Sequence, residues 1–329
     1  MAKSPLYVGL DVGGTTMKAA VVDENGKPRT KPVVLDTNPE QGQEAGLETM
    51  CETIRRAVAA AKLTMADIAA IGVATPGLMD IARGLILDPP NLKPWKNVPV
   101  RDHVKKAFGI PTAFQNDANA AAYGEFWVGA GKEVGSLVLF TLGTGVGGGI
   151  VLGDTVLEGK HSHGGELGHL RIESPATGRL CGCGHRGCLE AYASATSVVK
   201  RTREALASYR GPSKLKDYFT ANDDVLTSKV VFDLAAKGDE LAQTVVDDTA
   251  YYLALGACTV LATVDPEMIA IGGGMVAAGE SFLKKVQEFV LRFGLPHPAK
   301  GVVVRYAKLG SDAGFIGAAG CARMMVQSK

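Results

Sequence analysis

The sequence predicts an α/β protein in which one unit, headed by a strand hairpin, occurs twice. The chain has 329 residues, and at ~150 residues per domain this length indicates two domains. Apolar strand-like runs alternate with helix-like stretches, which argues for α/β layers. Two glycine-rich bends, each between strand-like runs, lie about 130 residues apart, so that Leu10 aligns with Phe140.

The first hairpin opens the chain. Residues 6–10 and 17–22 read as strands around the bend at 11–16, and Asn25-Gly26 is a strong turn signal. Walker-type and dinucleotide-binding loops need a helix directly after the glycines, so neither motif applies here. The next expected elements are a helix at 44–61, a strand at 69–74, a helix at 100–108, a strand at 112–115 and a helix opening at 116–119.

The second hairpin repeats the first. Residues 136–142 and 149–152 read as strands around the bend at 143–148. An irregular segment at 154–190 comes next, and the remaining elements are helical regions that include 230–263, a strand at 268–271, a third glycine bend at 272–274 and a final helix at 314–326.

Composition indicates an ordinary globular protein, with 46% hydrophobic and 21% charged residues. A net charge of +1 gives no bulk attraction to nucleic acid or anionic membrane, so neither partner is expected. The 41 glycines are roughly double the usual ~7% and follow no collagen-like period, which points to ligand-binding turns. No signal-peptide pattern opens the chain, so we expect a cytoplasmic protein, and the apolar run at 249–264 reads as a buried helix.

The glycine bends are suited to phosphate, because glycine lets backbone N–H groups approach oxygen and form an anion-binding nest. Asp11, at the tip of the first strand, is expected to hold Mg²⁺, through water. The alternative is a pair of plain tight hairpins, which need only two-residue turns. The expected nucleotide-binding residues are Asp11, Gly13, Gly14, Thr15, Thr16, Thr141, Gly143, Thr144, Gly145, Gly273 and Gly274.

Three of the six cysteines, Cys181, Cys183 and Cys188, lie within eight residues of one another. Their spacing lets three thiolates converge on one tetrahedral ion, so we expect structural zinc, with a redox thiol pair as the alternative. The fourth ligand must come from elsewhere, with candidates that include His161, His163, His169 and His185.

Asn116-Asp117 follows a strand end, where a helix N-cap is an equally good interpretation. Together with Asn91, Glu166 and Glu190, this pair supplies the carboxylates and amides that typically hydrogen-bond sugar hydroxyls. The position of these residues in the fold must decide between the two interpretations.

The chain resembles the ROK family of sugar kinases and repressors, most closely its bacterial glucokinase branch. The matching motifs follow the family's order and span nearly the whole chain: 10–16, 116–120, 142–149, 165–169, 181–190 and 272–274. The cysteine segment together with Gly-Glu-Leu-Gly-His is the most specific of them.

The resemblance implies a two-domain, actin-like ATPase fold of the ribonuclease H type. The small domain would comprise 1–115 and 311–329, and the large domain, 116–310, would carry the zinc-binding insert and the sugar site. The resemblance also implies an ATP:glucose phosphotransferase that uses Mg²⁺, transfers the γ-phosphoryl group to the 6-hydroxyl and assembles as a homodimer or homotetramer.

The same resemblance assigns roles to single residues. Asp117 would be the catalytic base, and Asn116, Glu166, His169 and Glu190 would bind the hexose, to which the residue chemistry adds Asn91. His169 would also join Cys181, Cys183 and Cys188 on zinc, so that zinc organises the sugar pocket.

Several alternatives stay open at this stage. The hexose could be fructose, mannose or an N-acetylhexosamine, and the donor could be polyphosphate. A sugar-sensing regulator of the same family is the alternative from another class. Family repressors carry a helix-turn-helix domain before the first phosphate loop, whereas ten residues precede Asp11 here, so the kinase is expected.

Overall fold

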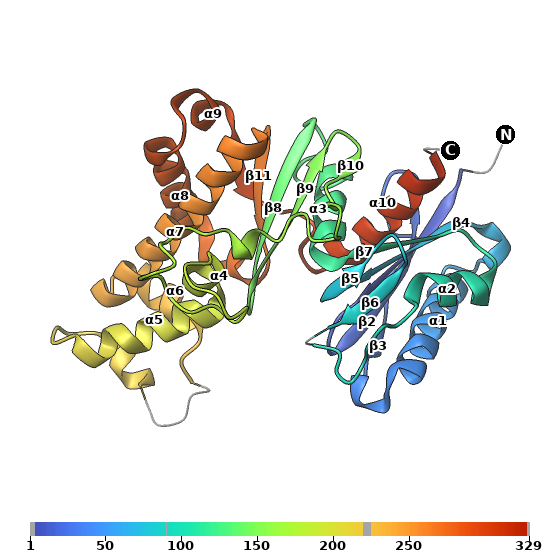
Figure 1. Ribbon diagram of the computed structural model, residues 1–329, viewed down its shortest axis with the longest axis horizontal. Coiled ribbons are helices and arrows are strands. Elements are labelled where there is room, and N and C mark those ends of the chain that lie inside the picture. The colour runs from blue at the N-terminus through green and yellow to red at the C-terminus, as the bar shows by residue number, and fades with distance from the viewer. Residues whose placement is uncertain (1–3, 90, 220–224, 328–329) are drawn as a thin grey trace. The chain divides into compact units, whose positions relative to one another are not determined.

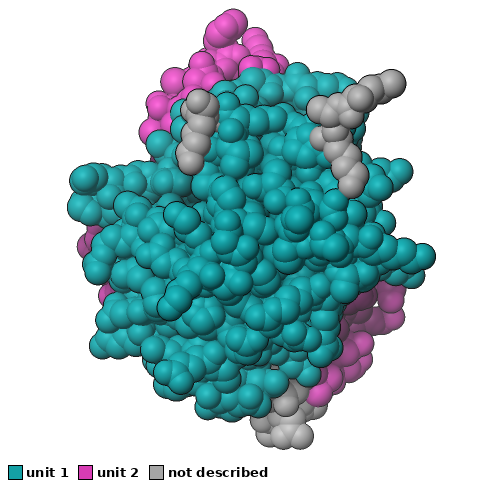
Figure 2. All heavy atoms as spheres, turned by 90° about the vertical axis from the view of Figure 1, so that its right-hand side faces the viewer, with its two compact units in different colours: residues 1–136, 149–165, 308–329 teal, residues 137–148, 166–307 magenta. Residues whose placement is uncertain are grey.

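The computed structural model describes residues 4–89, 91–219 and 225–327 (Figure 1). The chain divides into two compact units, coloured separately in Figure 2. Unit 1 contains residues 1–136, 149–165 and 308–329, and unit 2 contains 137–148 and 166–307. Because compactness alone defines these units, the expected domain limits at 115/116 and 310/311 stay a prediction.

Unit 1 is built on a five-stranded sheet of order β3-β2-β1-β4-β7. Its antiparallel part is formed by β1 (Leu6–Val12), β2 (Thr16–Asp23) and β3 (Val33–Asp36). Its parallel part is formed by β1, β4 (Ile68–Thr75) and β7 (Thr112–Asn116). A separate small hairpin joins β5 (Leu78–Asp80) to β6 (Leu85–Asp88).

Apolar side chains hold helices on both faces of this sheet. On one face, α1 (Gln43–Ala60) and α2 (Val100–Phe108) contribute Met50 and Val104 to a core that includes Leu10. On the other face, α10 (Ala313–Gln327) contributes Phe315 to a core with Tyr7, against which α3 (Asp117–Trp127) also packs. Both faces of the parallel strands are therefore covered, as burial of their apolar residues requires.

The backbone of α10 lies directly against the sheet, because two strand positions carry no side chain. A Cβ atom added at Gly9 or Gly72 would overlap the carbonyl oxygens of Phe315 or Ala318. On its α3 side, α10 presents Gly317 to the backbone of Ala120 in the same way. Close packing of backbone on backbone leaves no room for even a methyl group.

The second sheet has the order β10-β9-β8-β11-β12. Its strands are β8 (Ser136–Leu142), β9 (Val146–Leu152), β10 (Thr155–Val156), β11 (Met268–Gly272) and β12 (Val303–Tyr306). Each sheet thus has a hairpin, a third antiparallel strand and two further parallel strands. Asp11 pairs with Ala74, and Thr141 pairs with Gly272 at the matching position, so the predicted duplication is confirmed.

Unit 2 contains most of β8, the start of β9, β11 and β12, and the rest of it is mostly helical. The α-helices are α4 (Glu190–Ala193), α5 (Ala195–Ser208), α6 (Ser228–Ala236), α7 (Glu240–Val264), α8 (Gly279–Phe293) and α9 (Pro296–Gly301). Across both units, short 3₁₀ helices occur at η1 (Pro39–Gln41), η2 (Met65–Asp67), η3 (Leu167–His169), η4 (Lys214–Tyr218), η5 (Gly274–Ala278) and η6 (Gly310–Asp312).

The helical region expected at 230–263 is interrupted between α6 and α7. Gly238 adopts a φ of 87°, which ends the helix, and the side chain of Asp239 then accepts a hydrogen bond from the N–H of Ala242 to cap α7. Among the described residues, α7 alone is long and apolar enough to cross a membrane. Half of its most apolar stretch is buried inside the structure, in agreement with the expected buried helix.

The contact between α10 and α3 predicts a position-specific loss of stability. Gly317→Ala should lower the free energy of unfolding by about 2 kcal/mol or more, because the added methyl group meets the backbone of Ala120. Gly301→Ala is the matched control, since a Cβ atom there has no neighbour within 4 Å. Urea unfolding of both variants measures the difference, and equal stabilities would contradict the packing described.

Candidate active site

The first glycine bend, 13–15, connects β1 to β2 and is held by hydrogen bonds at Gly13 and Thr15. The N–H of Gly13 donates to the carbonyl of Thr16 at 2.8 Å, and the hydroxyl of Thr37 donates to the carbonyl of Gly13 at 2.8 Å. The N–H of Thr37 also donates to the carbonyl of Thr15 at 2.8 Å. The bend is therefore ordered by the chain that leaves β3.

Asn91, expected at the sugar, lies against the first bend. A Cβ atom added at Gly14 would lie 3.1 Å from the carbonyl oxygen of Asn91 and 3.3 Å from its Cβ. Gly14 therefore permits a close approach between two segments that are far apart in the sequence. The structure brings Asn91 next to an expected nucleotide-binding residue, and its role toward a sugar stays a prediction.

Asp11 stands at the carboxyl-terminal end of β1, opposite Lys18 in the antiparallel register. Burial raises the pKa of its carboxyl group to about 6, and the positive charge of Lys18 opposes the shift. Gly314, near the start of α10, makes room for this carboxylate, because a Cβ atom there would overlap it. The carboxylate is an oxygen ligand of the kind that Mg²⁺ prefers.

Asn116 and Asp117 mark the point where β7 passes into α3. The Oδ1 atom of Asn116 accepts hydrogen bonds from the N–H groups of Ala118 at 2.9 Å and Asn119 at 3.2 Å, so the N-cap interpretation is confirmed. Asp117 is the first helical residue, and its Oδ1 accepts from Ala118 at 2.8 Å. Asp117 therefore stands at the first turn of α3, directly after the cap.

The sequence did not predict the buried polar groups next to this turn. Gln115 accepts hydrogen bonds from the N–H of Asn116 at 2.8 Å and from the side chain of Asn119 at 3.3 Å, and it donates to Glu158 at 2.8 Å. Within the described ranges, the hydroxyl of Thr75 and Oδ1 of Asn119 are buried with no hydrogen-bond partner. The sequence signal that could have revealed this network is Gln115, a polar residue near the end of β7.

In unit 2, the second bend, 143–145, is held by α5 and by one carboxylate. The N–H of Ala195 donates to the carbonyl of Gly143 at 2.9 Å, and the hydroxyl of Thr196 donates to the carbonyl of Thr144 at 2.8 Å. The N–H of Val146, directly after the bend, donates to Oε2 of Glu190 at 3.0 Å. Glu190 therefore contacts the expected nucleotide-binding bend.

The third bend lies beside the second bend at the edge of the same sheet. Gly273 has a φ of 85°, and a Cβ atom there would overlap the backbone of Leu142. Gly274 begins η5 and has no neighbour within 4 Å of an added Cβ atom. Thr141 and Gly272 are paired in the sheet, so both glycine segments reach the carboxyl end of adjacent strands.

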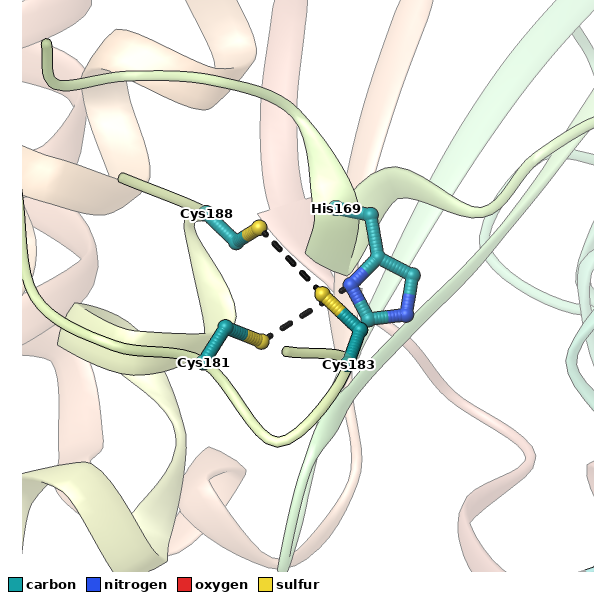
Figure 3. A group of neighbouring side chains, drawn as sticks. All are labelled: His169, Cys181, Cys183 and Cys188. Carbon is teal, nitrogen blue, oxygen red and sulfur yellow. Dashed lines mark hydrogen bonds between the residues drawn. The ribbon is translucent and has the colours of Figure 1, made fainter. Parts of the chain in front are cut away.

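Four side chains form a compact group of metal-ligating type in unit 2 (Figure 3). Their ligand atoms lie within 4.8 Å of one another: His169, Cys181, Cys183 and Cys188. The Sγ atoms of Cys183 and Cys188 are 3.7 Å apart, and a tetrahedral ion with ligands at ~2.3 Å has edges of about 3.8 Å. The group therefore fits a tetrahedral zinc ion.

His169 is the histidine that completes this group within the described residues. His185 lies 3.8 Å from Cys183 through Nδ1 but stands outside the group of four, and Nδ1 of His163 contacts the carbonyl of His161 instead. Of the candidates left open by the sequence, the structure brings His169 to the three thiols.

The turn that carries Glu166 and His169 packs on the start of β9. The N–H of His169 donates to the carbonyl of Glu166 at 3.0 Å, and Gly168 lies so close to the carbonyl of Val146 that a Cβ atom would overlap it. Oε1 of Glu190 is 3.6 Å from Sγ of Cys181. One carboxylate thus touches both the metal-ligand group and the second bend, a link that the sequence did not reveal.

The expected site residues fall into two sets, one in each unit. Unit 1 holds Asp11, Gly13, Gly14, Thr15, Thr16, Asn91, Asn116 and Asp117. Unit 2 holds Thr141, Gly143, Thr144, Gly145, Glu166, His169, Cys181, Cys183, Cys188, Glu190, Gly273 and Gly274. Within each unit, glycine bends and polar groups gather at the carboxyl ends of neighbouring strands, the usual location of ligand sites in α/β sheets.

The duplicated sheets with glycine bends define a class, the two-domain actin-like ATPases. The ROK family model matches residues 7–324. The glucokinase of Halalkalibacterium halodurans is 37% identical over 311 residues, covering 94% of this chain and 93% of that protein. The chain therefore belongs to the ROK family.

Solved structures agree with this assignment. A ROK hexokinase from Thermus thermophilus has a TM-score of 0.83 and 34% identity, covering 98% of this chain and 100% of that one. A ROK family glucokinase from Streptomyces griseus, in complex with glucose and AMPPNP, has a TM-score of 0.76 and 33% identity, covering 97% and 99% of the two chains.

The group of four ligands predicts bound metal that depends on its cysteines. Cys188→Ser should abolish the metal content of the purified protein, because it removes a buried thiolate ligand. Cys258→Ser is the control, since Cys258 lies outside the group. Elemental analysis by mass spectrometry checks this, and a Cys188→Ser protein with wild-type zinc content would refute the assignment.

Proposed function

We propose that this protein is an ATP-dependent hexokinase that transfers the γ-phosphoryl group of ATP to the 6-hydroxyl of glucose. The observation that carries the proposal is family membership over residues 7–324, together with the phosphate-type bends and Asn116-Asp117 at strand ends. The relatives named glucokinase, and the related structure with glucose and AMPPNP, favour glucose over other hexoses and ATP over polyphosphate.

Unit 1 supplies the base and the magnesium ligand in this proposal. Asp117 accepts the proton of the sugar hydroxyl, and its position at the start of α3 is fixed by the cap and by the hydrogen bond from Ala118. Asp11 holds Mg²⁺, which neutralises charge on the phosphates when bound. Gly13, Gly14, Thr15 and Thr16 present N–H and hydroxyl donors to the nucleotide.

Unit 2 supplies the second phosphate-binding segment and most of the sugar contacts. Thr141, Gly143, Thr144 and Gly145 donate to phosphate oxygens, with Gly273 and Gly274 beside them. Glu166, His169 and Glu190 are the proposed hexose-binding residues of unit 2, and Asn91 and Asn116 are those of unit 1. Enzymes of this type position groups and neutralise charge more than they perform covalent chemistry.

The Cys₃His group holds structural zinc in this proposal. Zn²⁺ on four protein ligands has no open position, so it orients its ligand loops and does not activate water. His169 and the neighbouring Glu190 then acquire fixed positions, which makes the metal an organiser of the sugar pocket. The family resemblance further favours a cytoplasmic enzyme of glycolysis that assembles as a homodimer or homotetramer.

The proposed reaction is tested by ADP release from Mg-ATP with glucose, mannose, fructose, N-acetylglucosamine and N-acetylmannosamine. Glucose should give the highest kcat/KM, and Asp117→Asn should lower kcat by at least about 100-fold while glucose affinity stays within about tenfold. Asp102→Asn, an exposed change on α2, is the control. Release with a different sugar would change the substrate, whereas no release with any sugar would refute the kinase.

The raised pKa of Asp11 predicts a pH-dependent requirement for Mg²⁺. As the pH falls through about 6, the carboxylate takes up a proton, so apparent Mg²⁺ affinity should fall. Asp11→Asn should bind Mg²⁺ weakly on both sides of that pH, and Asp36→Asn, an exposed change on β3, should behave like the wild type. Magnesium titrations of turnover at two pH values decide this, and identical curves for Asp11→Asn and wild type would exclude the role.

A further inference from the structure

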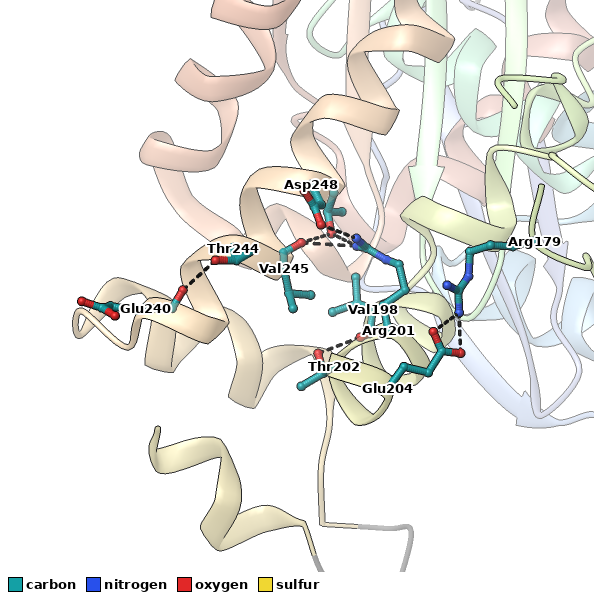
Figure 4. Close-up of polar contacts among 10 residues, drawn as sticks. Arg179, Val198, Arg201, Thr202, Glu204, Glu240, Thr244, Val245 and Asp248 are labelled. Carbon is teal, nitrogen blue, oxygen red and sulfur yellow. Dashed lines mark hydrogen bonds and ion pairs between the residues drawn. The ribbon is translucent and has the colours of Figure 1, made fainter. Parts of the chain in front are cut away.

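Unit 2 contains a polar cavity of about 560 Å³ that none of the residues assigned above lines. Its walls come from the segment 173–179, from Tyr192, from α5 and from α7. Figure 4 shows Arg179 and Glu204 directed at each other on one side and Arg201 reaching from α5 toward Val245 and Asp248 of α7. The volume lies in the range of small-molecule sites.

Arg201 is the buried cation of this cavity, with 8% of its surface exposed. One of its Nη atoms donates to the hydroxyl of Thr249 and to the carbonyl of Val245, and the other lies 3.6 Å from Asp248. Its Nε atom is buried and finds no acceptor in the described part of the chain. A buried donor without an acceptor is costly, so the guanidinium of Arg201 is the one incompletely satisfied cation among the residues that line this cavity.

The cavity also presents one acceptor that the protein leaves unused. Among the described residues, no hydrogen bond or ion pair reaches the carboxylate of Glu173, whereas Asp248 forms an ion pair with Arg201 at 3.6 Å. Arg179 is already neutralised by Glu204, with an N–O separation of 2.5 Å. Two arginines and three carboxylates line the space, so its net charge is negative. A phosphate or carboxylate group would therefore be repelled.

Two tyrosines give one wall an apolar face. The rings of Tyr192 and Tyr252 lie with centroids 4.3 Å apart, and the guanidinium of Arg201 is 5.8 Å from the ring centre of Tyr252. The hydroxyl of Tyr192 accepts a hydrogen bond from the N–H of Arg179 at 2.7 Å, which fixes that ring. A flat apolar surface beside unpaired donors and acceptors suits a molecule that carries C–H faces and many hydroxyls.

We infer that this cavity binds a neutral, polyhydroxylated small molecule of monosaccharide to disaccharide size, at a site separate from the proposed catalytic hexose site. Hydroxyl groups both donate and accept, so one ligand can serve Arg201 and Glu173 together without adding charge. The site shares α5 with the second glycine bend, since Ala195 and Thr196 hold that bend and Arg201 lies further along the same helix. Occupancy should therefore also change the affinity for ATP.

The test is a calorimetric titration of the full chain with trehalose and with glucitol, without ATP. Wild-type protein should bind at least one of them saturably at millimolar concentration, and Ala205→Trp, which fills the cavity from α5, should weaken binding by at least about tenfold. Ala207→Trp, exposed on the same helix and outside the cavity, should bind as the wild type does. Binding that Ala205→Trp weakens is binding at this cavity, because none of the proposed catalytic residues lines it.

Glu173→Gln provides a second variant that leaves α5 and α7 unchanged and should also weaken binding. The absence of saturable binding of both polyols to the wild type would overturn the inference, as would equal binding by Ala205→Trp in a folded state. Glucose 6-phosphate is the anionic probe. If it binds more tightly than the polyols and Ala205→Trp abolishes that binding, the site is anionic and the inference of a neutral ligand is wrong.

Discussion

The arrangement of candidate residues depends on one constraint, which is that parallel neighbouring strands end at the same edge of a sheet. In unit 1, β1, β4 and β7 are parallel neighbours, so Asp11, Thr75 and Asn116 reach one edge although long segments separate them in the chain. In unit 2 the same topology places Thr141 beside Gly272. Because a hairpin heads each sheet, a glycine bend lies at that edge in both.

The side chain of Glu190 also connects two segments that are distant in the sequence. Its two carboxylate oxygens serve two loops, one reaching the N–H of Val146 and the other lying near Sγ of Cys181. Only a side chain with two acceptor oxygens can do this at once. Glu190 therefore connects the cysteine loop to the strand that directly follows the bend at 143–145.

Local signals in the sequence predicted the hairpins, the glycine bends, the cap at Asn116 and the convergence of the three cysteines, because each depends on residues close in the chain. The strands β1 and β9 extend further into the bends than expected, to Val12 and from Val146, since ladder pairing continues there. The contact of Asn91 with Gly14, the Gln115 network and the Arg201 cavity depend on long-range packing, which no local pattern encodes. The roles toward sugar and nucleotide stay predictions for the same reason.

The position of α10 has a consequence for how the protein is made. Unit 1 takes its last layer from residues 313–327, after the chain has passed through all of unit 2. On the ribosome, the first sheet must therefore wait with Gly9 and Gly72 uncovered until that helix emerges. The contact between α10 and the first sheet is thus a long-range one, and long-range contacts of this kind slow folding.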